Sequence, residues 1–503
     1  MKYIKINPAD NVAVALQDLA KGEVVEGVTL QMDVPRGHKI VLKGLRAGEN
    51  VIKYGFPIGH VTRDAAAGTM VDHSCIKTNL EGLLEYKYEP LDYVKEDQSQ
   101  TVLSAPSSCT FKGFRRADGQ VGIRNQIWVI PTVGCVNGIC EQIVSRFKEE
   151  LCHSGCSEES SVDAIVHFPH NYGCSQLGDD HENTRKVLAD MVHHPNAGGV
   201  LVVSLGCENN QLDAFRELVG PVDESRVKMF VSQKVKDEVE YGVECLREIY
   251  AVASKDRRED VPVSELRVGL KCGGSDGLSG ITANPLLGVF SDWIVARGGT
   301  SILTEVPEMF GAETILMNRC QDEATFDRTV HLINDFKEYF MKQGMPVYEN
   351  PSPGNKAGGI STLEEKSLGC TQKCGKSVVR GVLKYAERLS VKGLNLLSAP
   401  GNDLVASTAL AASGCQIVLF TTGRGTPFGS FVPTMKISTN TPLYEAKPSW
   451  IDFNAGVLAQ GEPMEEVSAR FRDYVLAVAS GEPVNNEKHG IREIAIFKQG
   501  VTL

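Results

Sequence analysis

The chain has 503 residues, more than one hydrophobic core usually organises, so we expect about three domains. Its 63 acidic and 52 basic residues give a net charge of −11, which argues against a nucleic-acid or membrane-surface partner. No stretch approaches the ~20 apolar residues of a membrane span, and the first residues lack a signal-peptide pattern. We therefore expect a cytoplasmic protein. Its 14 cysteines are too scattered for a disulfide scaffold and should remain thiols.

Three kinds of segment follow one another along the chain. Residues 1–90 alternate short apolar runs with Gly- and Pro-containing breaks, which predicts a small β-rich domain. Residues 91–113 are polar and Ser-rich, as in a linker. From residue 114 the rhythm becomes strand, Gly-rich turn and helix, which predicts one α/β domain over 114–257 and another over 258–503. The predicted fold class is α/β, with mostly parallel sheets after the N-terminal β-rich domain.

Four cysteines lie just past predicted strands, each beside a glycine. They are Cys135, Cys174, Cys207 and Cys272. Cys370 has a similar glycine setting without an obvious strand before it. Ligands bind at the carboxyl ends of parallel strands, and thiolates suit soft or borderline metals, so the four cysteines are the predicted metal ligands. The alternative for each single cysteine is packing, because a thiol often fills space beneath a helix.

Polar side chains gather in the same loops, which favours a hydroxylated acid as the ligand. The predicted substrate-binding residues are Asn209, Asn210, Ser275, Asp276, Asn355 and Arg424. Arg424 is the candidate for the carboxylate, because a guanidinium offers a bidentate fork. His170 and Lys356 are the predicted acid–base residues. Glu305 and Glu308 lie in another such loop, and for each of these charges a turn or surface role is the alternative.

Two other kinds of site are not expected. Cys370 and Cys374 are one residue too far apart for a zinc ribbon and have no second pair. The stretches GGSDGLSG and TTGRGTPFGS are rich in glycine, but neither matches GxxxxGK[ST], nor GxGxxG between a strand and a helix. A structural zinc ion and a bound nucleotide are therefore not predicted.

Long motifs along nearly the whole chain resemble those of the altronate and galactarate dehydratase family, which also includes a sulfolactate sulfo-lyase. They include TVGCVNG, YGCSQLGDDHENTR, LGCENNQ, CGGSDGLSGITANP, LTEVPEMFGAE, YENPSPGNKAGGI and LEEKSLGCTQK. The resemblance implies removal of water from D-altronate to give 2-dehydro-3-deoxy-D-gluconate in hexuronate breakdown. It also implies an N-terminal SAF domain and iron(II) as cofactor. The cysteines leave open whether the iron is mononuclear or part of an oxygen-labile iron–sulfur cluster.

One segment departs from the family pattern. Where the family usually carries V-H-x-H-N, residues 71–75 of this chain are VDHSC. If the family's histidines take part in catalysis, Asp72 and His73 are the predicted replacements, and His60 is a further candidate.

Two alternatives to altronate dehydration stay open at the level of sequence. One is a dehydratase of another aldonate or aldarate, such as galactarate. The other is a sugar-acid-binding relative without catalytic activity, which the altered N-terminal histidines make conceivable. In every case the expected partner is a small sugar acid, and a homo-oligomer is compatible with the sequence.

Overall fold

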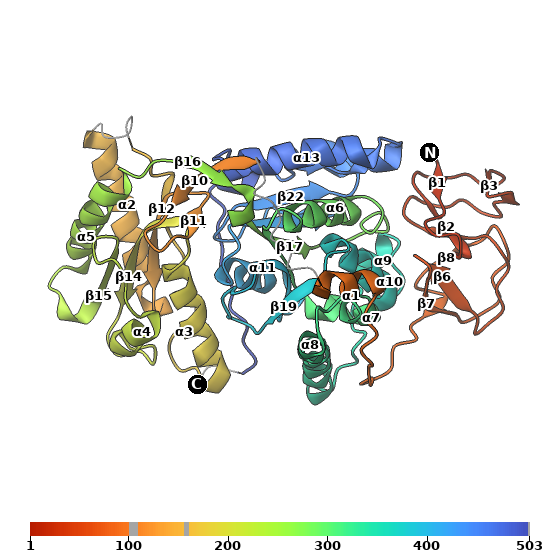
Figure 1. Cartoon of the computed structure of the whole chain (residues 1–503), viewed down its shortest axis with the longest axis horizontal. Coiled ribbons are helices and arrows are strands. Elements are labelled where there is room, and N and C mark those ends of the chain that lie inside the picture. Colours follow the sequence, from red (N-terminus) through yellow and green to blue (C-terminus); the bar gives the residue numbers. More distant parts are fainter. Residues whose placement is uncertain (100–108, 155–159, 501–503) are drawn as a thin grey trace.

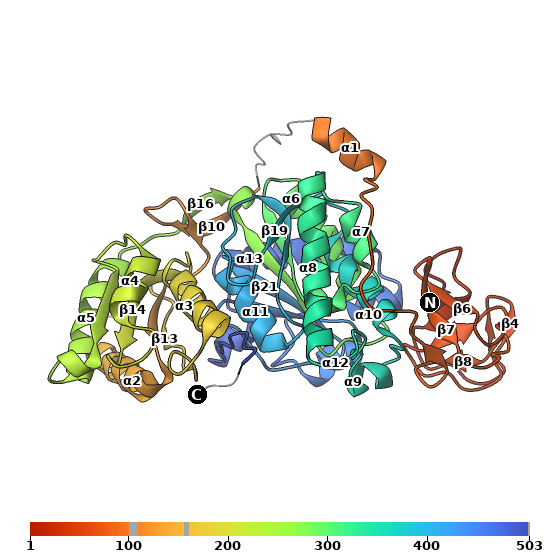
Figure 2. The same cartoon turned by 90° about the horizontal axis from the view of Figure 1, so that it is seen from below.

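A computed structural model describes residues 1–99, 109–154 and 160–500 of the chain. The C-terminal domain lies in the middle of an elongated molecule (Figures 1 and 2). The N-terminal domain packs at one of its ends and the second domain at the other. Among the described residues, no helix combines the length and apolar character needed to cross a bilayer.

The N-terminal domain consists of short antiparallel strands. One sheet has the order β1 (Tyr3–Ile4), β2 (Val12–Ala15), β5 (Lys39–Val41) and β8 (Met70–Val71). A second contains β6 (Asn50–Lys53), β7 (Phe56–Val61) and β9 (Ile76–Lys77), and β3 (Val24–Val25) pairs with β4 (Val28–Thr29). Buried aliphatic side chains such as Val14, Ile40 and Val61 form the small cores between these strands. The predicted β-rich character of this domain is confirmed.

The segment after the N-terminal domain contains helix α1 (Asp92–Ser99). Strand β10 (Thr110–Arg115) pairs antiparallel with β11 (Val121–Gly122) and with β16 (Glu259–Pro262). The predicted linker over 91–113 therefore includes a helix and the start of a strand, and its residues 100–108 lie outside the described part.

The second domain is built on a four-stranded parallel sheet. The strand order is β13 (Ala164–His167), β12 (Gln126–Pro131), β14 (Ala197–Ser204) and β15 (Val227–Val231). Helices α2 (Asn137–Ser154) and α5 (Glu238–Ala253) cover one face, and α3 (Gly178–Val192) and α4 (Leu212–Val219) cover the other. Successive residues of β12 point to opposite faces, so Val129 packs with α2 and α5, whereas Trp128 packs on the α3 side.

The C-terminal domain contains a seven-stranded parallel sheet. Its strand order is β19 (Val379–Leu383), β20 (Gly393–Leu397), β18 (Thr300–Leu303), β17 (Arg267–Cys272), β21 (Ile417–Thr422), β22 (Thr434–Ser438) and β23 (Phe453–Asn454). Its longer helices are α6 (Ala283–Val295), α8 (Glu323–Lys342), α10 (Leu363–Cys370), α11 (Asp403–Ala412) and α13 (Met464–Ala479). Short helices are α7 (Glu313–Met317), α9 (Pro353–Ala357), α12 (Thr441–Ala446) and α14 (Asn485–Lys488). Two α/β regions with parallel sheets were predicted, and both are present.

The second and C-terminal domains share part of one hydrophobic core. Side chains of α3 and α11 pack together between the two sheets. The last described residues run back to the second domain, where the backbone N–H groups of Gln499 and Gly500 donate to Asp180 at 2.8 and 2.7 Å.

Candidate active site

A compact group of metal-binding atoms lies at the carboxyl edge of the seven-stranded sheet. Cys272 ends strand β17, Cys370 ends helix α10, and Glu308 ends a short 3-10 helix, Val306–Glu308. The two Sγ atoms are 3.3 Å apart, and each lies 3.1 Å from Oε2 of Glu308. All three residues are buried. In the described chain this is the one set of three Cys, His, Asp or Glu ligand atoms within 4.8 Å of one another.

Buried lysines contact this group directly. Lys373 Nζ lies 2.9 Å from Sγ of Cys272 and 3.0 Å from Oε2 of Glu305. Lys366 Nζ lies 2.8 Å from Oε1 of Glu308. Burial alone would raise the pKa of Glu308, but the neighbouring ammonium groups outweigh it and hold that pKa well below its usual range. Glu308 is therefore an ionised carboxylate.

The charges around the two thiols balance. Lys271 ion-pairs with Glu305 and, at 2.8 Å, with Asp403. The hydrogen bond with Cys272 and burial raise the pKa of Cys370, so without a metal it is a neutral thiol. Around the two sulfur atoms, three carboxylates face three lysines, all in one chain of contacts. The carboxylates are those of Glu305, Glu308 and Asp403, and the lysines are Lys271, Lys366 and Lys373.

The same residues fit a divalent transition metal. Replacing the two thiol protons by one divalent cation creates two thiolates and leaves the net charge of the group unchanged. Two sulfur donors and one carboxylate oxygen also match the preference of borderline metals for mixed sulfur and oxygen ligands. Cys272, Glu308 and Cys370 are therefore the residues that fit such an ion.

Several predicted substrate residues surround the loop of residues 273–280, which follows β17. Asp276 is buried and accepts hydrogen bonds from Thr439 at 2.9 Å and from Asn440 at 3.1 Å. Asn355 is buried, and its Nδ2 donates to the Ser275 carbonyl oxygen at 2.8 Å.

The side chains of the other predicted residues near this loop make fewer contacts. Ser275 Oγ has no hydrogen-bond partner in the described chain and lines a 10 Å³ cavity beside Cys370. The Arg424 N–H donates to the Gly274 carbonyl oxygen at 3.0 Å, but its side chain is exposed. Lys356 is half-buried in α9. The structure thus brings Ser275, Asp276, Asn355 and Arg424 to one loop.

The N-terminal domain docks onto this region through buried charges. Lys39 and Lys53 reach Glu365 of α10 at 2.9 and 2.7 Å, and all three side chains are essentially fully buried. The backbone N–H of Asn79 donates to the neighbouring Glu364 at 2.6 Å. Helix α10 therefore carries Cys370 at its end and the docking carboxylates at its start.

Glycines allow the backbones to meet at this interface. A Cβ atom at Gly277 would lie 2.1 Å from the carbonyl oxygen of Gly37, and one at Gly359 would lie 2.4 Å from the same atom. Gly37 and Gly359 also have φ of +83° and +98°, which side-chain-bearing residues rarely adopt. Only glycine permits this approach of the N-terminal domain to the loop of residues 273–280.

Asp72, His73 and His60, the residues predicted to replace the family's histidines, lie in the N-terminal domain. The contacts of their side chains are local to this domain. Asp72 accepts hydrogen bonds from the backbone N–H and hydroxyl of Ser74 at 2.8 and 2.6 Å. Burial on its own would raise the pKa of Asp72, but the Ser74 hydrogen bonds outweigh it and the pKa is lowered. His73 is exposed, and His60 Nδ1 lies 2.7 Å from Oδ1 of Asn79.

The other predicted metal ligands lie in the second domain. Cys135, Cys174 and Cys207 are exposed on the loops that follow β12, β13 and β14. Backbone hydrogen bonds join these loops, from Gly134 to Tyr172 at 3.0 Å and from Asn210 to Gly173 at 3.1 Å. The four predicted cysteine ligands are thus divided between two domains. Cys272 lies in the C-terminal domain, where it contacts Cys370 and Glu308.

The predicted polar residues of the second domain stabilise its loops. His170 is buried, with Nε2 2.8 Å from the Pro131 carbonyl oxygen and Nδ1 accepting from the Tyr172 N–H at 3.1 Å. Burial lowers its pKa to about 4. Asn209 is exposed and accepts from the Ser175 N–H at 2.7 Å, and buried Asn210 donates to the Thr132 carbonyl oxygen at 3.2 Å.

Sequence reasoning missed the lysines of the buried group and the pairing of Cys370 with Cys272. One signal was available. In LEEKSLGCTQK, residues Lys366, Cys370 and Lys373 are spaced four and three apart, which places them on one face of a helix. The pairing of that face with the end of β17 depends on tertiary structure.

Three family models match successive parts of the chain. "Altronate/galactarate dehydratase SAF domain" matches residues 1–79. "D-galactarate dehydratase/Altronate hydrolase, second domain" matches residues 113–254. "D-galactarate/Altronate dehydratase, C-terminal" matches residues 263–502.

Curated relatives match over the full length. The chain is 57% identical to an altronate dehydratase of Bacillus subtilis (strain 168), over 100% of this chain and 99% of the relative. It is 55% identical to an altronate dehydratase of Escherichia coli (strain K12), over 100% of both. Identity to the galactarate dehydratase (L-threo-forming) of Escherichia coli (strain K12) is 33%, over 98% of this chain and 96% of the relative.

The chain has an SAF domain followed by two α/β domains, and its full-length relatives are dehydratases. It is therefore a dehydratase, an enzyme of the hydro-lyase class. The chain belongs to the altronate/galactarate dehydratase family. The resemblance noted in the sequence motifs is confirmed.

Proposed function

We propose that this enzyme removes water from D-altronate and forms 2-dehydro-3-deoxy-D-gluconate in hexuronate breakdown. The observation that carries the proposal is the 57% and 55% identity to two altronate dehydratases, against 33% to the galactarate dehydratase. A cytoplasmic setting is part of the proposal, because a reducing compartment suits the free thiols of the chain.

Elimination of water from a 2,3-dihydroxy acid needs a base for the C2 proton and an acid for the departing C3 hydroxide. Lys356 lies in α9, whose Asn355 holds the loop of residues 273–280, and Asp72 and His73 belong to the N-terminal domain, which docks against that loop through Gly37. Both ring nitrogens of His170 are occupied by backbone groups. We therefore propose that proton transfer takes place where the N-terminal domain meets the C-terminal domain.

We also propose that the metal is iron(II), held by Cys272, Glu308 and Cys370. Bound iron would supply a Lewis acid for the charge that develops on the substrate. The surrounding lysines keep the Glu308 carboxylate ionised and ready to bind a cation. Cys135, Cys174 and Cys207 stay predicted ligands of iron at the edge of the second domain.

An anaerobic assay of iron-reconstituted enzyme against a panel of aldonates and aldarates tests the proposed substrate. We expect D-altronate to have the highest kcat/KM, at least about tenfold above galactarate, which corresponds to about 1.4 kcal/mol of transition-state binding. A higher kcat/KM for galactarate would support the aldarate alternative. Binding of sugar acids without any 2-keto-3-deoxy product would support the non-catalytic alternative.

A further inference from the structure

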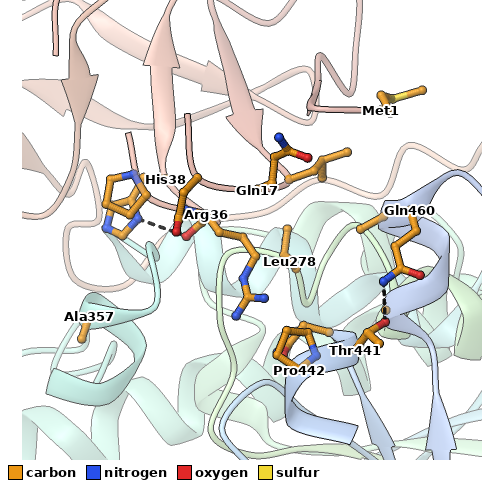
Figure 3. A pocket seen from close by; sticks show the side chains of 15 residues that line it. Met1, Gln17, Arg36, His38, Leu278, Ala357, Thr441, Pro442 and Gln460 are labelled. Atoms are coloured by element: carbon orange, nitrogen blue, oxygen red, sulfur yellow. Dashed lines mark hydrogen bonds between the residues drawn. The ribbon is translucent and has the colours of Figure 1, made fainter. Parts of the chain in front are cut away.

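A cavity of 710 Å³ lies between the N-terminal and C-terminal domains. It is large enough for a small-molecule site. Figure 3 shows Arg36 and His38 of the N-terminal domain on one side and Leu278, Thr441 and Gln460 of the C-terminal domain on the other. The loop of residues 273–280 borders both this cavity and the Cys272–Glu308–Cys370 group, because Leu278 lines the cavity and Ser275 lines the small space beside Cys370.

From this cavity we infer a sugar-acid site in which Arg36 binds the substrate carboxylate and His38 transfers the proton. The inference rests on the proposed dehydration and specifies where its substrate binds. Neither residue was among those predicted from the sequence.

The Arg36 guanidinium offers hydrogen-bond donors that no described residue uses, and its positive charge partly offsets the rise that burial causes in the pKa of nearby Asp276. The Arg36 side chain is half-buried, extends into the cavity in Figure 3, and its guanidinium has no hydrogen-bond or ion-pair partner in the described chain. The nearby Asp18 accepts a hydrogen bond from the backbone N–H of Arg36 at 2.8 Å, not from its side chain. Asp276 is held by Thr439 and Asn440. A carboxylate entering the cavity would therefore find a free bidentate partner.

The His38 ring is held in the tautomer that a base needs. Its Nδ1 lies 3.3 Å from the carbonyl oxygen of Arg36, which can only accept, so Nδ1 carries the proton. The other nitrogen, Nε2, has no partner in the part of the chain that the structure describes and is left with its lone pair when the ring is neutral.

Asp72 lies close enough to His38 for their charges to interact. Lys39 of β5 pairs with Val71 of β8, and His38 and Asp72 are the next residues beyond this end of the ladder. Attraction to His38 is one of the effects that lower the pKa of Asp72. Asp72 thereby acts as a positioning residue for the imidazole, and its ionised form favours the imidazolium that forms when His38 takes up a proton.

The proton and the leaving group balance in this arrangement. Nε2 of His38 takes the C2 proton, the C3–O bond breaks, and the imidazolium returns that proton to the departing hydroxide, which leaves as water. The remaining enol takes a proton from solvent at C3 and loses its hydroxyl proton to become the 2-keto acid.

The opposite wall suits the hydroxyl groups of such a substrate. Gln460 Nε2 donates to Thr441 Oγ1 at 3.0 Å, which fixes this amide at the wall of the cavity (Figure 3). The Gln17 side chain also lines the cavity and has no hydrogen-bond partner in the described chain. These two amides beside apolar Leu278 give the cavity the mixture of apolar and polar groups that is usual in small-molecule sites.

The test separates binding from proton transfer. Titration of D-altronate into the iron-free enzyme, followed by saturation-transfer NMR, measures binding, and the iron-loaded enzyme gives kcat and KM. We expect Arg36→Gln to weaken binding and raise KM by about 10- to 100-fold, with Arg36→Lys in between, because one charge-assisted bidentate pair is lost. We expect His38→Gln to lower kcat by about 10²- to 10⁴-fold with little change in binding.

Exposed residues of the same types are the matched controls. Arg46→Gln and His331→Gln should leave binding and kcat unchanged. If wild-type enzyme turns over D-altronate while Arg36→Gln and His38→Gln match it in both measurements, this site is wrong and the proposed function stands. If the wild type neither binds nor converts D-altronate, the proposed function itself fails.

Discussion

Two buried thiols 3.3 Å apart, a carboxylate and three lysines make the Cys272 region the chemically densest part of the chain. The charge balance of this group holds either with two thiol protons or with one divalent cation. Metal binding there is expected to release protons and to depend on both sulfur atoms.

Serine variants test which thiols hold iron. We expect Cys272→Ser and Cys370→Ser to lose most of the bound iron and all turnover, because a hydroxyl is a poor replacement for a thiolate ligand. Cys245→Ser, in α5 and outside both sets of proposed ligands, is the control and should keep wild-type iron content. Iron measured by colorimetric chelation after anaerobic reconstitution gives the answer. Loss of iron in Cys174→Ser or Cys207→Ser, with normal iron in Cys370→Ser, would move the iron site to the second domain.

A second single residue, the buried His170, makes the stability of the protein depend on pH. The His170 ring donates from Nε2 to a carbonyl and accepts at Nδ1, which only the neutral form can do. Its pKa of about 4 lies below the unfolded value of about 6.5, so the unfolded chain binds more protons between these values. The stabilisation is fully present above about pH 6.5 and is lost as the pH falls toward 4.

We expect this histidine to contribute about 2 kcal/mol to the loss of stability between about pH 7 and about pH 5. Urea unfolding at the two pH values, followed by Trp128 fluorescence with Trp293 and Trp450 replaced by phenylalanine, measures it. His170→Gln should lose about 2 kcal/mol less than the parent over this interval. Equal losses in both proteins would show that His170 does not titrate between folded and unfolded states.

At the scale of elements, helix α10 joins two functions. Every one of its residues is buried. Its first turn offers Glu364 and Glu365 to the N-terminal domain, and its later residues Lys366 and Cys370 face the metal-binding group. Movement of this helix would therefore affect both the docking of the N-terminal domain and the position of a proposed iron ligand.

Glu365→Gln tests this coupling. Loss of the carboxylate leaves Lys39 and Lys53 buried without a counter-ion, which is expected to cost about 3 to 5 kcal/mol. We expect faster hydrogen exchange in β7 and α10 and a strong fall in kcat/KM. Glu81→Gln, an exposed residue of the same type, should change neither. Unchanged exchange and activity in Glu365→Gln would show that the ion pairs do not hold the domains together.

At the scale of the whole molecule, periodicity was sufficient to predict the β-rich start and the two α/β regions. Alternating and 3.6-residue patterns record which faces are buried, so they report local structure well. They do not record which sheet a strand joins. The loops of Cys135 and Cys272 look alike in sequence, yet each ends a strand of a different sheet, and the predicted single metal site is therefore divided.

The interface between the N-terminal and C-terminal domains could not be predicted from sequence periodicity. Lys39 and Lys53 are each more than 300 residues from Glu365 along the chain, and all three look like ordinary surface charges in the sequence. Their burial follows from docking alone. For the same reason Arg36 and His38 gave no signal, although they line the cavity between the domains.

The proposed elimination of water from D-altronate is tested most directly by conversion of D-altronate with iron-loaded enzyme in ²H₂O, with the product examined by NMR and mass spectrometry. We predict 2-dehydro-3-deoxy-D-gluconate with one deuterium at C3, because the C2 hydrogen leaves as a proton and the enol is reprotonated by solvent. A product that carries the former C2 hydrogen at C3 in place of deuterium would contradict this proposal. The absence of any 2-keto-3-deoxy acid would contradict it as well.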